Sequence, residues 1–370
     1  MTHTERTLAV LRYENYDRLP IVHFGFWRDT LEKWHTEGHL SQEEYEDQSD
    51  DNRYDRAIAE KLGFDFNWQN MLQANTGLHP GFETKVVRTL PDGSRHVLNS
   101  AGVVTVENPN ASGIPAHIDH LLKGRASWEE HYKWRHEFSA DRIDNDDLEA
   151  LRARSRDTPV GIHCGSLFGH MRNVLGIEGV SYLYVDDEIL YREIIDTVGK
   201  LCFNATRYLL QSGFRFNFAH FWEDICFKNG PLVNPEVFRE CVGPHYKRIT
   251  TLVNNHGIDI VSLDCDGMID ALIPIWFENG VNTMFPIEVG TWNASIAPWR
   301  KEYGKELRGV GGMDKRVFAY GRSEIDAEIE RLRPLIALGG YIPCPDHRIP
   351  PDAEWDNVRY YCGRMRRTFG

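Results

Sequence analysis

Short apolar runs alternate with longer amphipathic stretches along most of the chain, and the alternation is clearest after residue 158. Several of these runs have the length of a strand and are apolar on both faces, which is typical of buried strands in a parallel sheet. Eight runs begin near residues 20, 64, 159, 215, 259, 283, 307 and 341, and helical sequence follows each of them. This alternation predicts an α/β fold, and eight units predict closure into a (β/α)8 TIM barrel.

Residues 83 to 108 depart from this pattern. Polar and apolar positions alternate there, and Pro91-Asp-Gly93 is a turn sequence, as expected of antiparallel hairpins. The stretch is too short to bury a core of its own. We therefore predict a single domain over residues 1–370, with a β-hairpin insertion at about 83–108.

Composition and charge narrow the classes of function. The net charge is −13 without a long run of Lys or Arg, so the surface repels phosphate backbones and nucleic acid is not an expected partner. No apolar run approaches the roughly 20 residues that span a bilayer, and the first residues do not resemble a signal peptide. We expect a cytoplasmic protein without membrane contact. The seven cysteines include no CxxC pair and are predicted to be free thiols.

Polar side chains of metal-ligand type follow three of the predicted strands. Val261-Ser-Leu-Asp-Cys-Asp-Gly267 places Asp264, Cys265 and Asp266 at one strand end, Glu288 follows the next strand, and His347 follows the last. Catalytic groups of (β/α)8 barrels lie at these C-terminal ends. Carboxylates with a histidine and a nearby thiol suit a zinc site that leaves one position open for substrate. We predict that these five residues bind the metal and that Asp264, Asp266 and His347 are catalytic.

Each of these residues also has a structural alternative. Asp266 could cap the following helix, and Cys265 could be a small core residue, since it shares a strand face with Val261 and Leu263. Glu288 could form a salt bridge. His347 could be an ordinary solvated loop residue, although the prolines around it favour a positioned side chain.

Other strand ends carry a further carboxylate and several aromatic rings. Among His163, His170, Glu223 and Asp224 we favour Glu223 for proton transfer, because a partly desolvated carboxylate has a raised pKa. An apolar substrate pocket is predicted from His163 and the aromatic residues Phe26, Trp27, Trp68, Phe168 and Trp222. The alternative is that the aromatic rings belong to ordinary barrel packing.

Several motifs resemble the uroporphyrinogen decarboxylase superfamily. They are Gly165-Ser-Leu-Phe-Gly, Trp222-Glu-Asp, Asn229-Gly-Pro, Asp264-Cys-Asp-Gly, Phe285-Pro-Ile-Glu, Gly311-Gly-Met-Asp-Lys-Arg and Asp346-His-Arg-Ile-Pro-Pro. The resemblance runs from about residue 15 to 367 and implies a (β/α)8 barrel. It also implies one of two activities, since the superfamily contains decarboxylases and zinc-dependent methyltransferases that serve corrinoid proteins.

The resemblance favours the methyltransferase branch. The decarboxylases carry an arginine-rich signature after the first strand, whereas this chain has Phe24-Gly-Phe-Trp-Arg28-Asp29. The methyltransferases place zinc ligands at positions that correspond here to Asp264, Asp266 and His347. Oxygen and nitrogen ligands of this kind resemble the enzymes that demethylate methoxylated aromatics.

The function implied is transfer of a methyl group from a small methylated donor, an aryl methyl ether, to the cobalt of a partner corrinoid protein (cobalamin type). The cofactors implied are zinc and that corrinoid, and a homodimer is one assembly we consider. The alternatives are a decarboxylase acting on a carboxylated, uroporphyrinogen-like substrate and a catalytically silent binding barrel.

Overall fold

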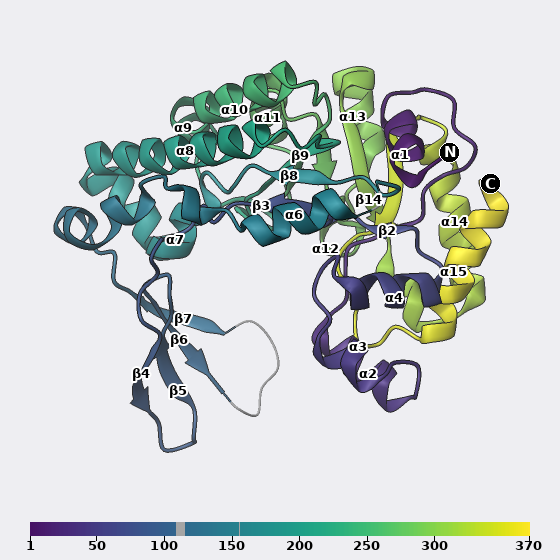
Figure 1. Cartoon of the computed structure of the whole chain (residues 1–370), viewed down its shortest axis with the longest axis horizontal. Helices are drawn as coiled ribbons and strands as arrows, with labels where there is room; N and C mark the ends of the chain where they lie inside the picture. Colours follow the sequence, from purple (N-terminus) through teal and green to yellow (C-terminus); the bar gives the residue numbers. More distant parts are fainter. Residues whose placement is uncertain (109–114, 155) are drawn as a thin grey trace.

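The computed structural model describes residues 1–108, 115–154 and 156–370 of the chain. A parallel sheet of seven strands crosses its centre, and helices pack around the sheet (Figure 1). Its strands in spatial order are β3 (Met71–Gln73), β8 (Gly161–His163), β9 (Phe218–Trp222), β12 (Val261–Asp264), β13 (Thr283–Phe285), β14 (Arg308–Met313) and β15 (Tyr341–Pro345). Parallel strands that are joined by helices are covered on both faces, which explains their nearly continuous apolar sequence.

The first two predicted strands pair with each other outside this sheet. β1 (Val22–His23) and β2 (Phe66–Asn67) form a parallel pair, and the chain then bends so that β3 pairs with β8 instead. A single parallel bridge joins Phe26 to Ile349, just after β15. All eight predicted strand regions therefore contain parallel strands. Within the described residues these parallel strands form a seven-stranded sheet and a separate two-stranded sheet, and not one continuous closed sheet.

Helical connections follow the strands, as the alternation predicts. Those before β8 are α1 (His3–Leu11), α2 (Arg28–Thr36), α3 (Gln42–Glu46), α4 (Arg53–Leu62), α5 (Arg125–Ser127), η1 (Trp128–Tyr132), η2 (Lys133–His136), η3 (Ala140–Arg142) and α6 (Asn145–Ala153). Those after it are α7 (Gly169–Asp186), α8 (Glu188–Gln211), α9 (Pro235–Cys241), α10 (Gly243–Asn255), α11 (Ile273–Glu278), α12 (Val289–Trp292), α13 (Ile296–Tyr303), η4 (Gly304–Glu306), η5 (Lys315–Ala319), α14 (Arg322–Ile336) and α15 (Trp355–Thr368). A short hairpin of β10 (Cys226–Phe227) and β11 (Gly230–Pro231) follows β9.

The long helix α8 shows how local sequence sets these elements. The Asp187 side chain accepts a hydrogen bond from the Leu190 N–H at 2.8 Å and so caps the first turn. Leu190, Ile194 and Val198 then recur at a helical spacing and are buried against the sheet. No helix among the described residues combines the length and the apolar character needed to cross a lipid bilayer.

The insertion is larger than the sequence indicated. It is a four-stranded antiparallel sheet of β4 (Lys85–Thr89), β5 (Arg95–Leu98), β6 (Val103–Glu107) and β7 (Ala116–His120), so it extends beyond residue 108 to residue 120. Figure 1 shows this sheet projecting from the body of the molecule below α7. The fourth strand was missed because its sequence, Ala-His-Ile-Asp-His, has a single large aliphatic residue.

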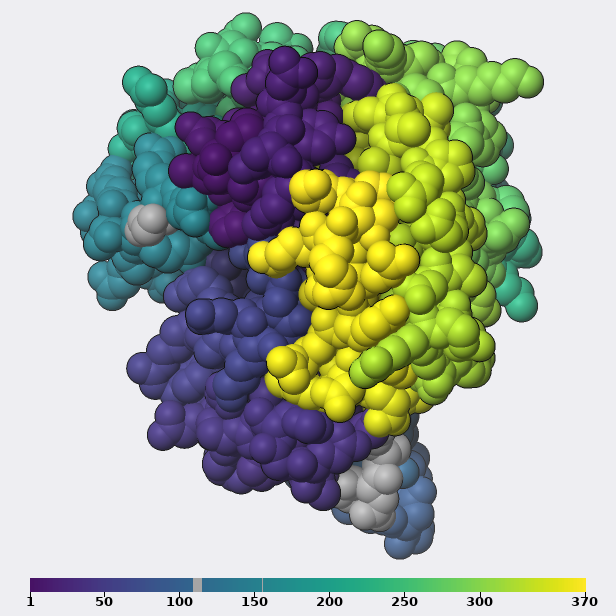
Figure 2. All heavy atoms as spheres, turned by 90° about the vertical axis from the view of Figure 1, so that its right-hand side faces the viewer, coloured from purple at the N-terminus to yellow at the C-terminus, as the bar shows by residue number. Residues whose placement is uncertain are grey.

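The two ends of the chain lie side by side. Figure 2 shows the N-terminal segment in purple against the C-terminal segment in yellow. The Leu19 N–H donates to the Phe369 carbonyl at 3.2 Å, and the Arg366 guanidinium contacts the Asp65 carboxylate at 3.1 Å. These contacts hold β1 and β2 next to the last helix, and so they fix the first strands beside β15.

Packing between β13 and β14 supplies a stability prediction. Gly311 has a φ of +124°, and a Cβ placed there would lie 2.4 Å from the Ile287 backbone nitrogen. We expect Gly311→Ala to lower the free energy of unfolding by about 2–4 kcal/mol, because backbone strain and overpacking add. Gly304→Ala is the control, since its φ is +71° but no atom lies within 4 Å of the added Cβ. Equal losses in urea unfolding for the two variants would contradict this account.

Candidate metal and substrate site

A cavity of about 640 Å³ opens at the C-terminal ends of the parallel strands. Its lining combines carboxylates, neutral polar groups and aromatic rings in one space: Phe24, Trp27, Ser49, Asp50, Gln69, Met71, Gln73, Thr76, His163, Ser166, His170, Asn173, His220, Trp222, Asp224, Asp264, Asp266, His347 and Arg348. This is the end of a parallel α/β sheet where catalytic groups are found.

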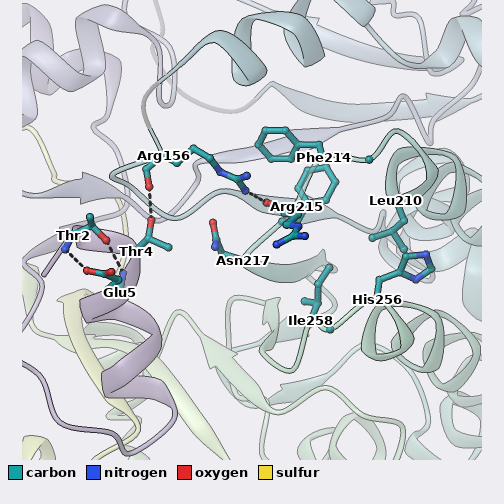
Figure 3. Close-up of a pocket in the computed structure, with 13 residues that line it drawn as sticks. Thr2, Thr4, Glu5, Arg156, Leu210, Phe214, Arg215, Asn217, His256 and Ile258 are labelled. Atoms are coloured by element: carbon teal, nitrogen blue, oxygen red, sulfur yellow. Dashed lines mark hydrogen bonds between the residues drawn. The ribbon is translucent and has the colours of Figure 1, made fainter.

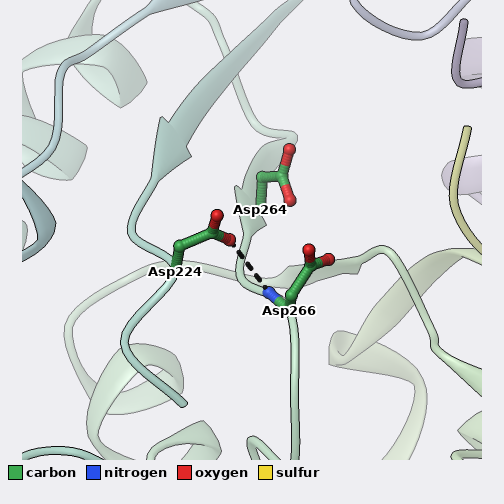
Figure 4. Close-up of side chains that lie close together, drawn as sticks. All are labelled: Asp224, Asp264 and Asp266. Carbon is green, nitrogen blue, oxygen red and sulfur yellow. Dashed lines mark hydrogen bonds between the residues drawn. The ribbon is translucent and has the colours of Figure 1, made fainter. Parts of the chain in front are cut away.

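Three aspartates converge at this cavity (Figure 4). Asp264 ends β12 directly opposite Trp222 of β9, so the residues that follow on the two strands meet. One carboxylate oxygen from each of Asp224, Asp264 and Asp266 lies within 4.8 Å of the others. Asp224 adopts a left-handed backbone conformation, with a φ of 50°, and its carboxylate accepts the Asp266 N–H at 3.2 Å. The strand register and this turn together bring the three carboxylates to one point.

Burial makes this arrangement electrostatically costly. Desolvation and the neighbouring Asp266 raise the pKa of Asp224 to about 6. Desolvation, with Asp266 and Asp224, also raises the pKa of Asp264 well above its ordinary value. One buried oxygen of Asp266, Oδ1, has no hydrogen-bond partner among the described residues. Buried carboxylates that lack donors are stabilised by a cation, so the cluster has the properties of a metal site.

His347 joins the cluster from the loop after β15. Its Nε2 lies 3.3 Å from Asp266 Oδ2. The ring stacks on Trp27 with centroids 5.4 Å apart and meets the edge of Phe24 at 5.3 Å, so two aromatic side chains fix its orientation. The next residue, Arg348, pairs with Asp50 at 2.5 Å and holds the loop. Three carboxylates and one imidazole are ligands that zinc accepts in proteins.

Two predicted ligands lie outside this group. The carboxylate of Glu288 accepts the Gly267 N–H at 2.6 Å and the Thr291 hydroxyl at 2.8 Å, so it supports the loop that carries Asp266. Cys265 is buried in the core, where its sulfur accepts the Ile225 N–H at 3.4 Å. Neither residue lines the cavity. The geometry therefore favours the core alternative for Cys265, whereas Glu288 supports the loop through hydrogen bonds and not through the salt bridge that was its alternative.

Glu223 was predicted to transfer protons, yet its carboxylate faces away from the cavity. It is fully buried and accepts the N–H groups of Leu167, Phe168 and Gly169 at 2.6–2.9 Å. The Tyr246 hydroxyl also donates to it. Burial raises the pKa of Glu223, as predicted, but the side chain anchors the start of α7 and reaches the cavity only through the Ser166 hydroxyl, which donates to it at 3.4 Å.

The predicted aromatic pocket is divided between the cavity and the core. Trp27 and Trp222 line the cavity, and so does His163. Phe26 packs on Trp34, Trp68 stacks on Phe218, and Phe168 meets Phe238, all away from the lining. For these three rings the packing alternative is the one the geometry favours.

Several lining residues were absent from the predicted site. Asp224 and His220 come from the end of β9, while Gln69 donates to Asp264 Oδ2 at 3.2 Å. A signal for the first two was present, because alternate residues of a strand share a face. His220, Trp222 and Asp224 have the same parity, whereas Glu223 has the opposite one.

A larger cavity, of about 810 Å³, lies at the other end of the sheet (Figure 3). Its lining includes residues 213–217 and 256–258, which precede β9 and β12. The polar groups there are engaged locally, since Thr4 donates to the Arg156 carbonyl and Arg156 to the Arg215 carbonyl. It brings together no cluster of metal-ligating side chains among the described residues. The chemistry therefore points to the smaller cavity.

Comparison with known proteins bears on the fold. No family model and no curated protein matches the sequence. A methyltransferase from Methanosarcina mazei has a similar structure, with a TM-score of 0.65 at 14% identity, over 100% of this chain and 99% of that one.

Two vitamin-B12 independent methionine synthases are more distant. A putative one from Listeria monocytogenes has a TM-score of 0.44 at 11% identity, over 95% of this chain and 97% of that one. The other, from a Shewanella species, has a TM-score of 0.48 at 11% identity, over 95% and 98%. The similarity to the Methanosarcina mazei protein extends over the whole chain. It shows that this chain has the same fold, an α/β architecture of the TIM-barrel kind.

Proposed function

We propose that this protein transfers a methyl group from a small methylated substrate, a methoxylated aromatic, to the cobalt of a partner corrinoid protein. One observation carries the proposal: Asp224, Asp264 and Asp266 converge, with His347 beside them, at a cavity at the C-terminal strand ends. The similar structure is named a methyltransferase, which supports the same class of reaction.

The metal in this proposal is zinc, held by three of the four side chains of Asp224, Asp264, Asp266 and His347. The donor set fits, because a catalytic zinc site uses three protein ligands of oxygen and nitrogen type and leaves a position for substrate. The unpartnered Asp266 Oδ1 supplies a free lone pair for it. Zinc in this position supplies a Lewis acid for the ether oxygen, where negative charge develops as the methyl group leaves.

The chain's own residues then bind and orient the substrate. Phe24, Trp27 and Trp222 give the cavity flat apolar walls on which an aromatic ring can stack. Trp27 and Phe24 also hold the His347 ring in place. The methyl acceptor is a corrinoid that a separate protein presents at the open end of the cavity.

The charge of the cavity argues against the decarboxylase alternative. Arg348 is the one Lys or Arg among the described lining residues, and it is paired with Asp50. A substrate with several carboxylates needs unpaired cations to bind it. Four aspartates line the same cavity and would repel such a substrate.

We further propose that residues 1–370 form one domain of the uroporphyrinogen decarboxylase superfamily. In this view the parallel sheet closes through β1 and β2, which the bridge between Phe26 and Ile349 supports. The sheet of β4 to β7 is an insertion into that domain.

Removing a ligand tests the metal site. We expect Asp266→Asn and His347→Ala each to lower both the zinc content of the purified protein and the rate of methyl transfer. Loss of one group that stabilises developing charge costs on the order of 10²-fold in rate. The rate is followed by the absorbance change of a reduced corrinoid protein incubated with a methoxyarene.

Two controls separate metal loss from unfolding. Asp352→Asn removes an exposed carboxylate after β15 and should change neither quantity. Glu223→Gln replaces one of the two oxygens that accept three N–H groups with an NH2 donor, and should lower the thermal midpoint while zinc stays bound. A parent protein that holds no metal and transfers methyl groups without it would refute the proposal.

The raised pKa of Asp224 predicts a pH dependence for the metal-free protein. Between its ordinary value of 3.8 and about 6, the folded state keeps a proton that the unfolded chain has lost. The contribution of Asp224 to stability is therefore present below about pH 4 and is lost as pH rises through 6. The loss is about 2–3 kcal/mol, and Asp224→Asn should remove it.

Urea unfolding from pH 4 to 7 measures this difference between parent and variant. Saturating zinc should reverse the trend in the parent, because metal binding requires the deprotonated carboxylates. Parallel curves for the metal-free parent and Asp224→Asn would contradict the raised pKa.

A further inference from the structure

Three histidines form a wall of the cavity that the proposed metal chemistry does not use. His163 ends β8, His220 lies in β9, and His170 lies at the start of α7. An imidazole can donate, accept or carry charge, so what this wall recognises depends on the protonation of each ring. Neighbouring groups on the protein determine that protonation.

We assign the proton of neutral His220 to Nδ1. Its Nδ1 lies 2.7 Å from the Ser262 hydroxyl oxygen, and that hydroxyl donates to the Ala219 carbonyl at 3.3 Å. Because the serine proton is engaged with the carbonyl, the oxygen accepts from His220. The Nε2 of His220 therefore carries a lone pair, and no hydrogen bond from the described residues reaches it.

His163 is held in the opposite tautomer. Its Nδ1 accepts the Gly165 N–H at 3.0 Å, so in the neutral ring the proton lies on Nε2. The rings of His163 and His220 are 5.9 Å apart. One of them thus offers a donor and the other an acceptor, and both rings line the same cavity.

His170 adds a second acceptor. The Nδ1 of His136 donates to the Tyr132 carbonyl at 2.9 Å, so the Nε2 of His136 is an acceptor in the neutral ring. It lies 2.7 Å from His170 Nε2, which must then be the donor. The Nδ1 of His170 is consequently left with a lone pair.

Burial keeps the wall uncharged. It lowers the pKa of His163 to about 4 and that of His170 to about 3, and it lowers the pKa of His220 well below its ordinary value. All three rings are neutral at pH 7, and the wall attracts anions only through dipoles. The histidine wall therefore distinguishes ligands by whether their polar groups donate or accept hydrogen bonds.

We propose that His163 and His220 form a subsite for a free hydroxyl group on the ligand, whose oxygen accepts from His163 Nε2–H and whose proton goes to His220 Nε2. The subsite rests on the proposed function in that it lies in the same cavity and names the substrate's second polar group. Ser262 is a positioning residue, since it sets the tautomer of His220.

The subsite excludes two close relatives of a hydroxyl. A methyl ether oxygen can accept from His163 but has no proton for His220, whose buried lone pair would lose its partner. A carboxylate brings only acceptors and a charge that no unpaired cation among the described lining residues balances. A site built to hydrogen-bond a hydroxyl rejects analogues without one.

Binding calorimetry with three probes of similar size tests the subsite. The probes are 2-methoxyphenol, 1,2-dimethoxybenzene and 2-methoxybenzoate, each titrated into the full-length protein with and without zinc. We expect 2-methoxyphenol to bind about tenfold to a hundredfold more tightly than the other two. This is the expected effect of one buried hydrogen bond, to His220 Nε2, that the phenol makes and the other two probes cannot make.

Variants test which residues cause the preference for 2-methoxyphenol. His220→Phe should abolish it, and Ser262→Ala should reduce it with almost no change of volume, because His220 is then free to move its proton to Nε2. Nitrogen-15 shifts of the imidazole rings report that change of tautomer independently of binding. Asp352→Asn alters an exposed residue outside the lining and should leave the ratio of affinities unchanged.

A metal-site variant separates this inference from the proposed function. If the hydroxyl binds the metal instead, Asp266→Asn removes the preference and His220→Phe keeps it, and the subsite is refuted. Equal binding of the three probes, or no binding of any, also refutes it. Retained preference in a protein that transfers no methyl group upholds the subsite and overturns only the proposed function.

Discussion

Mutual repulsion of three carboxylates is the constraint on which this site depends. Their oxygens lie within 4.8 Å of one another in a largely buried setting, where like charges interact strongly. The surrounding structure holds them there through the register of β9 against β12, the turn at Asp224, and the hydrogen bond from Gln69 to Asp264. The Glu288 carboxylate accepts the Gly267 N–H and so supports the loop that carries Asp266. A bound cation would relieve this repulsion.

The two sides of the cavity are chemically opposite. One side carries the aspartates and His347, whose ring stacks on Trp27. The other side carries the neutral rings of His163 and His220. Parallel strands make this division possible, because the last inward residue of each strand enters the cavity from a different direction. Asp264 from β12 and His163 from β8 are two such residues. A substrate can be oriented at both ends without an unpaired cation.

Sequence patterns predicted the strand regions and two of the three aspartates that converge at the cavity, and particular residues show what the patterns missed. Asp264, Asp266 and His347 lie in the cavity because each follows an apolar run at a C-terminal strand end, which periodicity detects. Glu223 was chosen over Asp224 on desolvation alone, although strand parity assigns Asp224 to the face of His220 and Trp222. The tautomer of His220 depends on Ser262, 42 positions away, and no local pattern reports it. The split of the second strand between β2 and β3 depends likewise on pairing with distant partners.

Anomalous diffraction from crystals of the protein grown with zinc tests the central claim most directly. Data collected on both sides of the zinc absorption edge locate the ion without reference to activity. The account predicts one strong anomalous peak about 2.0–2.2 Å from at least three of the side chains of Asp224, Asp264, Asp266 and His347. A map without a peak in this cavity, or with zinc bound only elsewhere on the molecule, would contradict it.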